Sequence, residues 1–142
     1  MRLLLNIDVP DLATAERFYV EAFGLRPGRR LGDGVLELLG AEVPIFLLAN
    51  DPGTPAAGDD IRDYARHWSP LHADVVVDDV DAALSRALGA GARQEGDIRD
   101  ADWGRIVTIA DPFGHGWCLL QFLGRGYDHI ATTVQPSTGT SE

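Results

Sequence analysis

Apolar and polar positions follow the same order twice along this chain. Residues 3–9 form a mainly apolar run, Asp11 follows, and apolar residues then recur at helical spacing. The same order returns at Val77-Asp78-Asp79-Val80, which is similar to Val9-Pro10-Asp11-Leu12. A strand, an acidic N-cap and an amphipathic helix are therefore expected in each half. Two similar halves that face each other create a cleft between them, and clefts are where small ligands usually bind.

In residues 1–49 the pattern predicts one strand, one helix and three further strands. Asp11 is a suitable N-cap because its carboxylate can accept hydrogen bonds from the free amides of the first turn. Gly24 is a suitable C-cap, since glycine adopts the left-handed conformation that ends many helices. Glycine-containing turns separate the three further strand candidates, which are Arg29 to Leu31, Val35 to Leu39, and Val43 to Ala49.

Residues 71–123 are predicted to repeat this order. The strand His72 to Val77 precedes a second helix, which Asp79 caps and which ends in Gly89-Ala90-Gly91. A tight turn at Asp111-Pro112-Phe113-Gly114 comes before the last strand. The later strand candidates are Ala92 to Glu95, Arg105 to Ala110, and Trp117 to Leu123.

The remaining segments are assigned by their composition. Residues 50–70 are rich in Pro, Gly, Ala and Asp and are predicted to be a linker, with a short helical turn around residues 60–66. Residues 124–131 extend the domain, and the polar residues 132–142 are predicted to be a disordered tail. We therefore expect one α+β domain over residues 1–131, in which two paired βαβββ modules form a curved, mixed, eight-stranded sheet around a cleft.

Charge and composition exclude several partners. The formal net charge of the 142 residues is -10, which argues against nucleic acid and against anionic membrane surfaces. This charge suits a cationic ligand, although acidity also serves solubility alone. The single cysteine, Cys118, excludes an intrachain disulfide. No apolar run approaches the ~18 residues of a membrane span, and the short N-terminal run lacks the features of a signal peptide. We expect a cytoplasmic protein.

Three groups of residues resemble the vicinal oxygen chelate superfamily, which includes glyoxalase I, extradiol dioxygenases, fosfomycin resistance enzymes and bleomycin resistance proteins. In the first half they are Asp11-Leu12 with Ala15, Phe18-Tyr19 and Phe23-Gly24-Leu25; in the second half they are Val77 to Ala83 and Asp111 to His115. The resemblance covers nearly all of residues 1–123 and implies the paired-module fold and a homodimer. It does not imply one reaction, because this fold serves many.

The resemblance also implies a divalent metal held at up to four strand positions. Counting from the caps and the last turn, these positions are His72, Leu4, Cys118, and one of Ile45, Phe46 or Leu47. A catalytic metal usually needs three protein ligands, and hard metals avoid sulfur. We therefore expect no metal cofactor, with His72 as the ligand if one binds. Glu37 is the alternative source of a displaced ligand.

Strand alternation predicts which side chains share a cavity. Asn6, Asp8, His72 and Asp74 are expected on one face together with Cys118, either to orient a ligand or as a hydrogen-bonded network that ties the halves together. Glu37 is a further cavity candidate or a paired surface residue. Trp103 is a lid or plain packing. Cys118 is a nucleophile with His72 as its base, or an inert buried thiol.

These residues support two functional hypotheses. The first is a metal-independent protein that binds a small aromatic or hydrophobic molecule, because the fold motifs are present while the metal ligands are mostly absent. The alternative is a metal-dependent lyase, isomerase or dioxygenase with a rearranged site that uses His72. Both hypotheses expect a small-molecule partner and a homodimer.

Overall fold

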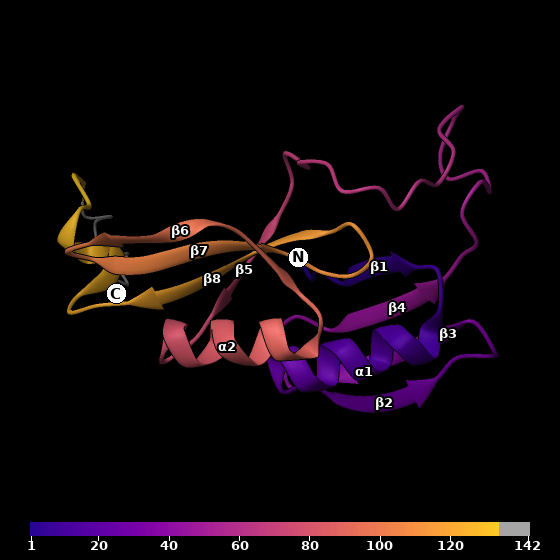
Figure 1. Ribbon diagram of the computed structural model, residues 1–142, viewed down its shortest axis with the longest axis horizontal. Helices are drawn as coiled ribbons and strands as arrows, with labels where there is room; N and C mark the ends of the chain where they lie inside the picture. Colours follow the sequence, from indigo (N-terminus) through magenta and orange to yellow (C-terminus); the bar gives the residue numbers. More distant parts are fainter. Residues whose placement is uncertain (134–142) are drawn as a thin grey trace, which may run out of the picture.

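The computed structural model describes residues 1–133; residues 134–142, most of the predicted tail, lie outside the described residues. The two βαβββ modules of the sequence pattern are present (Figure 1). The first consists of β1 (Leu5–Val9), α1 (Leu12–Phe23), β2 (Arg26–Arg30), β3 (Val35–Leu39) and β4 (Ile45–Ala49). The second consists of β5 (Ala73–Val76), α2 (Val80–Ala90), β6 (Arg93–Ala101), β7 (Gly104–Ala110) and β8 (Gly116–Phe122), and a 3-10 turn, η1 (Gly126–His129), follows.

The helices begin and end where the sequence places their caps. The Asp11 carboxylate accepts from the Thr14 amide at 2.9 Å, and the Asp79 carboxylate accepts from the Ala82 amide at 3.1 Å. Gly24 ends α1 in the left-handed conformation, with φ of 68°. Each carboxylate satisfies an amide that has no partner within its own helix, so these contacts fix where the chain turns from strand to helix.

The eight strands form two four-stranded sheets, with the orders β1-β4-β3-β2 and β5-β8-β7-β6. In each sheet the first strand pairs in parallel with the last strand of its own module, and the other pairs are antiparallel. The α+β class with two modules is thus confirmed, but no strand pairing joins the two sheets within the described residues. Figure 1 shows α1 and α2 adjoining at the middle of the molecule, with the two sheets extending to opposite sides.

A single hydrophobic core joins the two modules. The buried faces of the helices, which include Phe18 and Tyr19 on α1 and Val80 and Ala87 on α2, pack against one face of each sheet. Trp117 on β8 is 6% exposed and belongs to the same core. No helix among residues 1–133 is long and apolar enough to cross a membrane.

A buried carboxylate connects the modules at the turn before β8. Asp111 is 5% exposed and accepts hydrogen bonds from the hydroxyl of Tyr19 on α1 and from the indole of Trp117. It also accepts from the backbone amides of Phe113 and His115, at 2.9 Å and 3.0 Å. Burial, and then the nearby Asp111 charge, raise the pKa of Tyr19 well above its ordinary value, so this phenol remains a hydrogen-bond donor.

The linker, residues 50–70, differs from the prediction. The expected helical turn around residues 60–66 is wrong: this segment is irregular, with an isolated bridge between Pro55 and Ile61. The reason is that alternate side chains reach to different parts of the fold. Arg62 pairs with Asp8 at 2.9 Å, and Arg66 pairs with Glu95 at 2.7 Å. Between them, the Tyr64 hydroxyl donates to the Asn50 carbonyl at 2.7 Å. Contacts from every second residue require an extended chain, because residues two apart on a helix do not share a face.

Strand bounds differ from the prediction most at two places. β2 begins at Arg26 rather than Arg29, and β6 continues to Ala101 instead of ending at Glu95. The register of β6 against β7 shifts between Glu95 and Arg99, and Gly96 lies there with φ of 83°. Glycine at this backbone angle permits a bulge and lets the strand continue beyond it.

The buried Asp111 carboxylate gives a stability prediction. Replacing Asp111 by Ala leaves the Tyr19 hydroxyl, the Trp117 indole and two amides without their acceptor, so we expect a loss of about 3 kcal/mol or more in the free energy of unfolding. Urea unfolding followed by circular dichroism measures it. The control is Asp102→Ala, because the Asp102 side chain is 93% exposed; equal effects of the two substitutions would contradict the structural role of Asp111.

Candidate functional site

Each sheet has a face that points away from the helices, which we call the open face. Along β1 and β5 the exposure alternates as strand geometry requires. Ile7 and Val9 belong to the core, whereas Asn6 and Asp8 lie on the open face of the first sheet. His72 and Asp74 lie on the open face of the second sheet, opposite to Ala73 and Val75. The predicted alternation is therefore observed within each strand, but the two pairs lie on separate sheets, and a cavity shared by all four stays a prediction.

His72, Asp74 and Cys118 form a compact cluster on the second open face. Their potential ligand atoms all lie within 4.8 Å of one another, and His72 Nε2 is 3.5 Å from Asp74 Oδ1. The strand register explains this convergence: Asp74 is the direct partner of Cys118 across β5 and β8, and His72 precedes Asp74 by one strand repeat. About a third of the His72 and Asp74 side chains remains exposed.

The Cys118 thiol lies at the buried base of this cluster. Cys118 is 4% exposed, and burial raises the pKa of its thiol, to which the nearby Asp74 also contributes. The Thr108 hydroxyl on β7 lies 3.5 Å from the sulfur. A thiol with a raised pKa is mostly protonated at neutral pH and is a weak nucleophile. Of the two alternatives for Cys118, the environment therefore favours an inert buried thiol over a nucleophile with His72 as its base.

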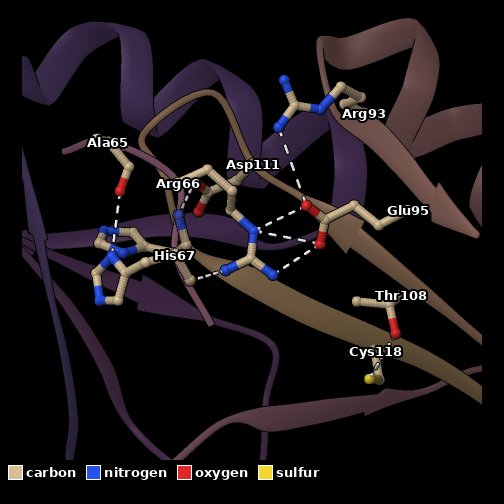
Figure 2. Close-up of polar contacts among 9 residues, drawn as sticks. Ala65, Arg66, His67, Arg93, Glu95, Thr108, Asp111 and Cys118 are labelled. Atoms are coloured by element: carbon tan, nitrogen blue, oxygen red, sulfur yellow. Dashed lines mark hydrogen bonds and ion pairs between the residues drawn. The ribbon is translucent and has the colours of Figure 1, made fainter. Parts of the chain in front are cut away.

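The linker brings two further side chains to this face. The Trp68 ring lies against the His72 imidazole, with ring centroids 4.8 Å apart. The Arg66 guanidinium lies over Gly116, where a Cβ atom would meet it. Figure 2 shows Arg66 directed toward Glu95, with Arg93 on the other side of that carboxylate and with Thr108 and Cys118 farther along the sheet. A linker therefore forms part of the wall beside the cluster.

The first open face carries fewer free polar groups. The register places Phe46 opposite Asn6, as Cys118 is opposite Asp74, so Phe46 is the counterpart of Cys118 in the first module. The next residue across the sheet is Glu37, whose carboxylate is held by Arg29 at 2.6 Å. This ion pair lowers the pKa of Glu37. Glu37 thus lies on the first sheet with its charge already compensated.

Asp8 and Trp103 are held by structural contacts. The Asp8 carboxylate accepts from Arg62 at 2.9 Å and from the Asn50 amide at 3.1 Å. The Trp103 ring packs on Tyr127 of the 3-10 turn, with centroids 5.2 Å apart. Among the hydrogen bonds and ion pairs of residues 1–133, none joins Asn6 or Asp8 to the His72 cluster. A ligand-binding role for Asn6, Asp8, Glu37 and Trp103 stays a prediction.

Sequence reasoning missed three parts of this site. Arg66 and Glu95 were not singled out, because their pairing joins the linker to a strand across a long stretch of chain. Asp74 was placed on the cavity face but was not counted as a metal donor. A usable signal existed for Asp74, since a His-x-Asp pattern in one strand puts both side chains on one face. No comparable pattern of neighbouring residues predicts the pairing of Arg66 with Glu95.

Comparison with known proteins assigns the family. A model of the glyoxalase-like domain matches residues 5–120, and the chain belongs to this family within the vicinal oxygen chelate superfamily. Uncharacterized protein Rv0887c of Mycobacterium tuberculosis is 37% identical over 121 residues, which are 82% of this chain and 71% of the relative. Uncharacterized protein Mb0911c of Mycobacterium bovis is also 37% identical, over 82% of this chain and 80% of the relative.

Solved structures agree with this fold. The fosfomycin resistance protein FosX from Listeria monocytogenes aligns with a TM-score of 0.66 and 18% identity, over 85% of this chain and 92% of that chain. TioX from a Micromonospora species aligns with a TM-score of 0.66 and 21% identity, over 87% and 99%. At these identities the likeness concerns the fold.

The donors at the family's four metal positions are incomplete in this chain. Leu4 and Phe46 are apolar and supply none, which leaves His72 and Cys118. The full set of four donors therefore does not fit this chain. Asp74, which is not at one of the four positions, is the third residue that the structure brings to the same place. A metal in this protein would thus be held from the second sheet alone.

The Arg66–Glu95 ion pair gives a prediction on acid stability. Pairing with Arg66 lowers the pKa of Glu95, so its contribution is complete above the ordinary glutamate pKa and is lost as the pH falls through the lowered value. The carboxylate is partly exposed, so we expect a contribution of about 1 kcal/mol. Glu95→Gln should remove this part of the acid sensitivity between about pH 5 and 3, measured by urea unfolding at each pH.

The matched control for this experiment is Glu37→Gln. Glu37 also pairs with an arginine, but on the first sheet and not with the linker. Hydrogen exchange of residues 62–68 should therefore accelerate in Glu95→Gln and stay unchanged in Glu37→Gln. Equal exchange in both variants would show that Arg66 does not hold the linker against the second sheet.

Proposed function

We propose that this protein binds a small aromatic or hydrophobic molecule on the open face of its second sheet, without requiring the family's metal centre. The observation that carries the proposal is the replacement of two metal positions by Leu4 and Phe46 on the first sheet, while the open face of the second sheet presents the His72–Asp74–Cys118 cluster. Ligand sites typically combine an apolar lining with a few polar groups that fix orientation. Val76, 60% exposed, adjoins the cluster on β5, and Trp68 is 55% exposed.

The apolar part of the face extends beyond the cluster. Leu120 and Phe122 follow Cys118 at alternate positions of β8, and Phe122 packs against Tyr127. A ligand on this face would therefore place a polar group near His72 and Asp74 and an apolar group toward the exposed side chains of Val76 and Phe122. Small-molecule binding is also found among the structural neighbours, since a FosX variant was solved with Mn(II) and 1S,2S-dihydroxypropylphosphonic acid.

A thermal-shift screen against planar aromatic compounds tests this proposal. Ligands that bind the folded state at 100 times their dissociation constant stabilise it by about 2.7 kcal/mol, a shift of several degrees in Tm. We expect His72→Ala and Asp74→Ala to reduce the shift by more than they lower the Tm of the free protein. His67→Ala is the control, because His67 is an exposed linker residue. Equal stabilisation of the wild type and His72→Ala by every hit would contradict the site.

We also propose that the protein is a homodimer. Leu3, Leu4 and Leu71 are 63%, 51% and 89% exposed, and they lie next to the strands that carry the open face. The outer strands β2 and β6 have backbone N–H and C=O groups without a strand partner, and pairing with a second copy would cover them. Sedimentation at micromolar concentration should give twice the chain mass of 15.3 kDa. A 15.3 kDa species alone would contradict the dimer.

The expected cytoplasmic location rests on composition alone.

The second candidate function is a metal-dependent lyase, isomerase or dioxygenase. The specific observation in its favour is the convergence of His72, Asp74 and Cys118, because three protein donors are what catalytic metal sites usually provide. A bound metal would act as a Lewis acid on a substrate oxygen. The chain's own residues would hold it and would leave the outward side of the cluster free for the substrate.

A further inference from the structure

We propose that His72, Asp74 and Cys118 form a binding site for a thiophilic divalent ion such as Zn²⁺ or Co²⁺, built from the second module alone. This inference deepens the second candidate function by naming the class of metal and the complete set of protein donors. It does not require that the protein binds an organic ligand.

The backbone brings the three donors together without help from the first module. β5 and β8 are neighbours with a parallel register that pairs Asp74 with Cys118, and strand alternation puts His72 on the same face. The donor atoms lie within 4.8 Å of one another. Bonds of about 2.0–2.3 Å to one tetrahedral ion require donors roughly 3.3–3.8 Å apart. The His72–Asp74 pair, at 3.5 Å, is already in this range, and the Cys118 sulfur lies at most 4.8 Å from either donor.

The donor types select the metal. An imidazole nitrogen, a carboxylate oxygen and a thiolate sulfur suit Zn²⁺ and Co²⁺, whereas Mg²⁺ and Mn²⁺ favour sites with oxygen ligands. The sulfur is the donor that discriminates, and it comes from a residue that is only 4% exposed. A thiol at this position therefore moves the preference of the site away from hard ions.

Neighbouring groups hold the donors in place. The Thr108 hydroxyl lies 3.5 Å from the Cys118 sulfur on the side away from β5, and the Trp68 ring lies against His72. Contacts of this kind restrict the orientation of metal ligands and commonly affect metal affinity 10- to 100-fold. The partial exposure of His72 and Asp74 gives the ion a path from solvent and leaves a fourth position open.

Titration of the metal-free protein with Co²⁺ tests the inference. A thiolate ligand produces an intense sulfur-to-cobalt charge-transfer band in the near ultraviolet, and tetrahedral geometry produces visible bands of high intensity. We expect one equivalent of Co²⁺ to produce both, Zn²⁺ to displace it, and excess Mg²⁺ or Mn²⁺ to leave the spectrum unchanged. Cys118→Ser should abolish the near-ultraviolet band, and Asp74→Asn should weaken Co²⁺ binding at least tenfold.

Asp102→Asn is the control, because Asp102 is a carboxylate outside the cluster, its side chain is 93% exposed, and its replacement should not change the spectrum. Thermal unfolding of each variant without metal verifies its fold, and Asp74→Asn keeps the test decisive if Cys118→Ser is unstable. Absence of a charge-transfer band, or equal spectra in the wild type and Asp74→Asn, would overturn the site. Because the titration contains no organic ligand, a negative result would not contradict the small-molecule proposal, which the thermal-shift screen tests separately.

Discussion

The Asp111 carboxylate accepts hydrogen bonds from Tyr19 in the first module and from Trp117 in the second. Both donors also pack against each other, with ring centroids 5.8 Å apart, so the polar contact sits inside the aromatic core. A buried carboxylate is tolerated only when its oxygens are satisfied, and here each oxygen has two donors. The geometry of the β8 turn and the packing of α1 therefore depend on one another.

This dependence extends to the open face. The turn that holds Asp111 leads directly into β8, which carries Cys118, and its His115 imidazole contacts the Asp8 backbone carbonyl of β1 at 2.7 Å. Gly114 in the same turn lies so close to the Tyr64 carbonyl that a Cβ atom would not fit. The turn thus contacts the linker and both modules and leads into β8, the strand that bears the Cys118 thiol. A well-ordered turn therefore helps to position Cys118 relative to β5.

Local patterns account for the parts of the fold that the sequence predicted. The Asp caps, the glycine C-caps and the alternation along β1 and β5 each depend on residues close in the chain, and all are observed. The linker conformation depends instead on Asp8 and Glu95, which attract Arg62 and Arg66 from distant strands, so composition suggested a helical turn that does not form. Asp111 illustrates the same limit of local patterns. The neighbouring proline indicates that Asp111 lies in a turn, but its burial depends on Tyr19, which is distant in the sequence.

The two open faces show why the chemistry of this chain is concentrated in its second module. At corresponding positions the first sheet has Asn6 and Phe46 where the second has Asp74 and Cys118. The acidic groups that the first sheet does carry are engaged, Asp8 by Arg62 and Glu37 by Arg29. A charge compensated by a well-placed guanidinium attracts a further polar ligand less strongly, because that ligand must compete with the existing ion pair. His72 and Asp74 have no arginine partner among the ion pairs of residues 1–133 and stay partly exposed. A molecule or ion that approaches the protein therefore meets partly exposed donors without an arginine partner on the second sheet, while the first sheet offers mainly apolar contact through Phe46 and Leu4.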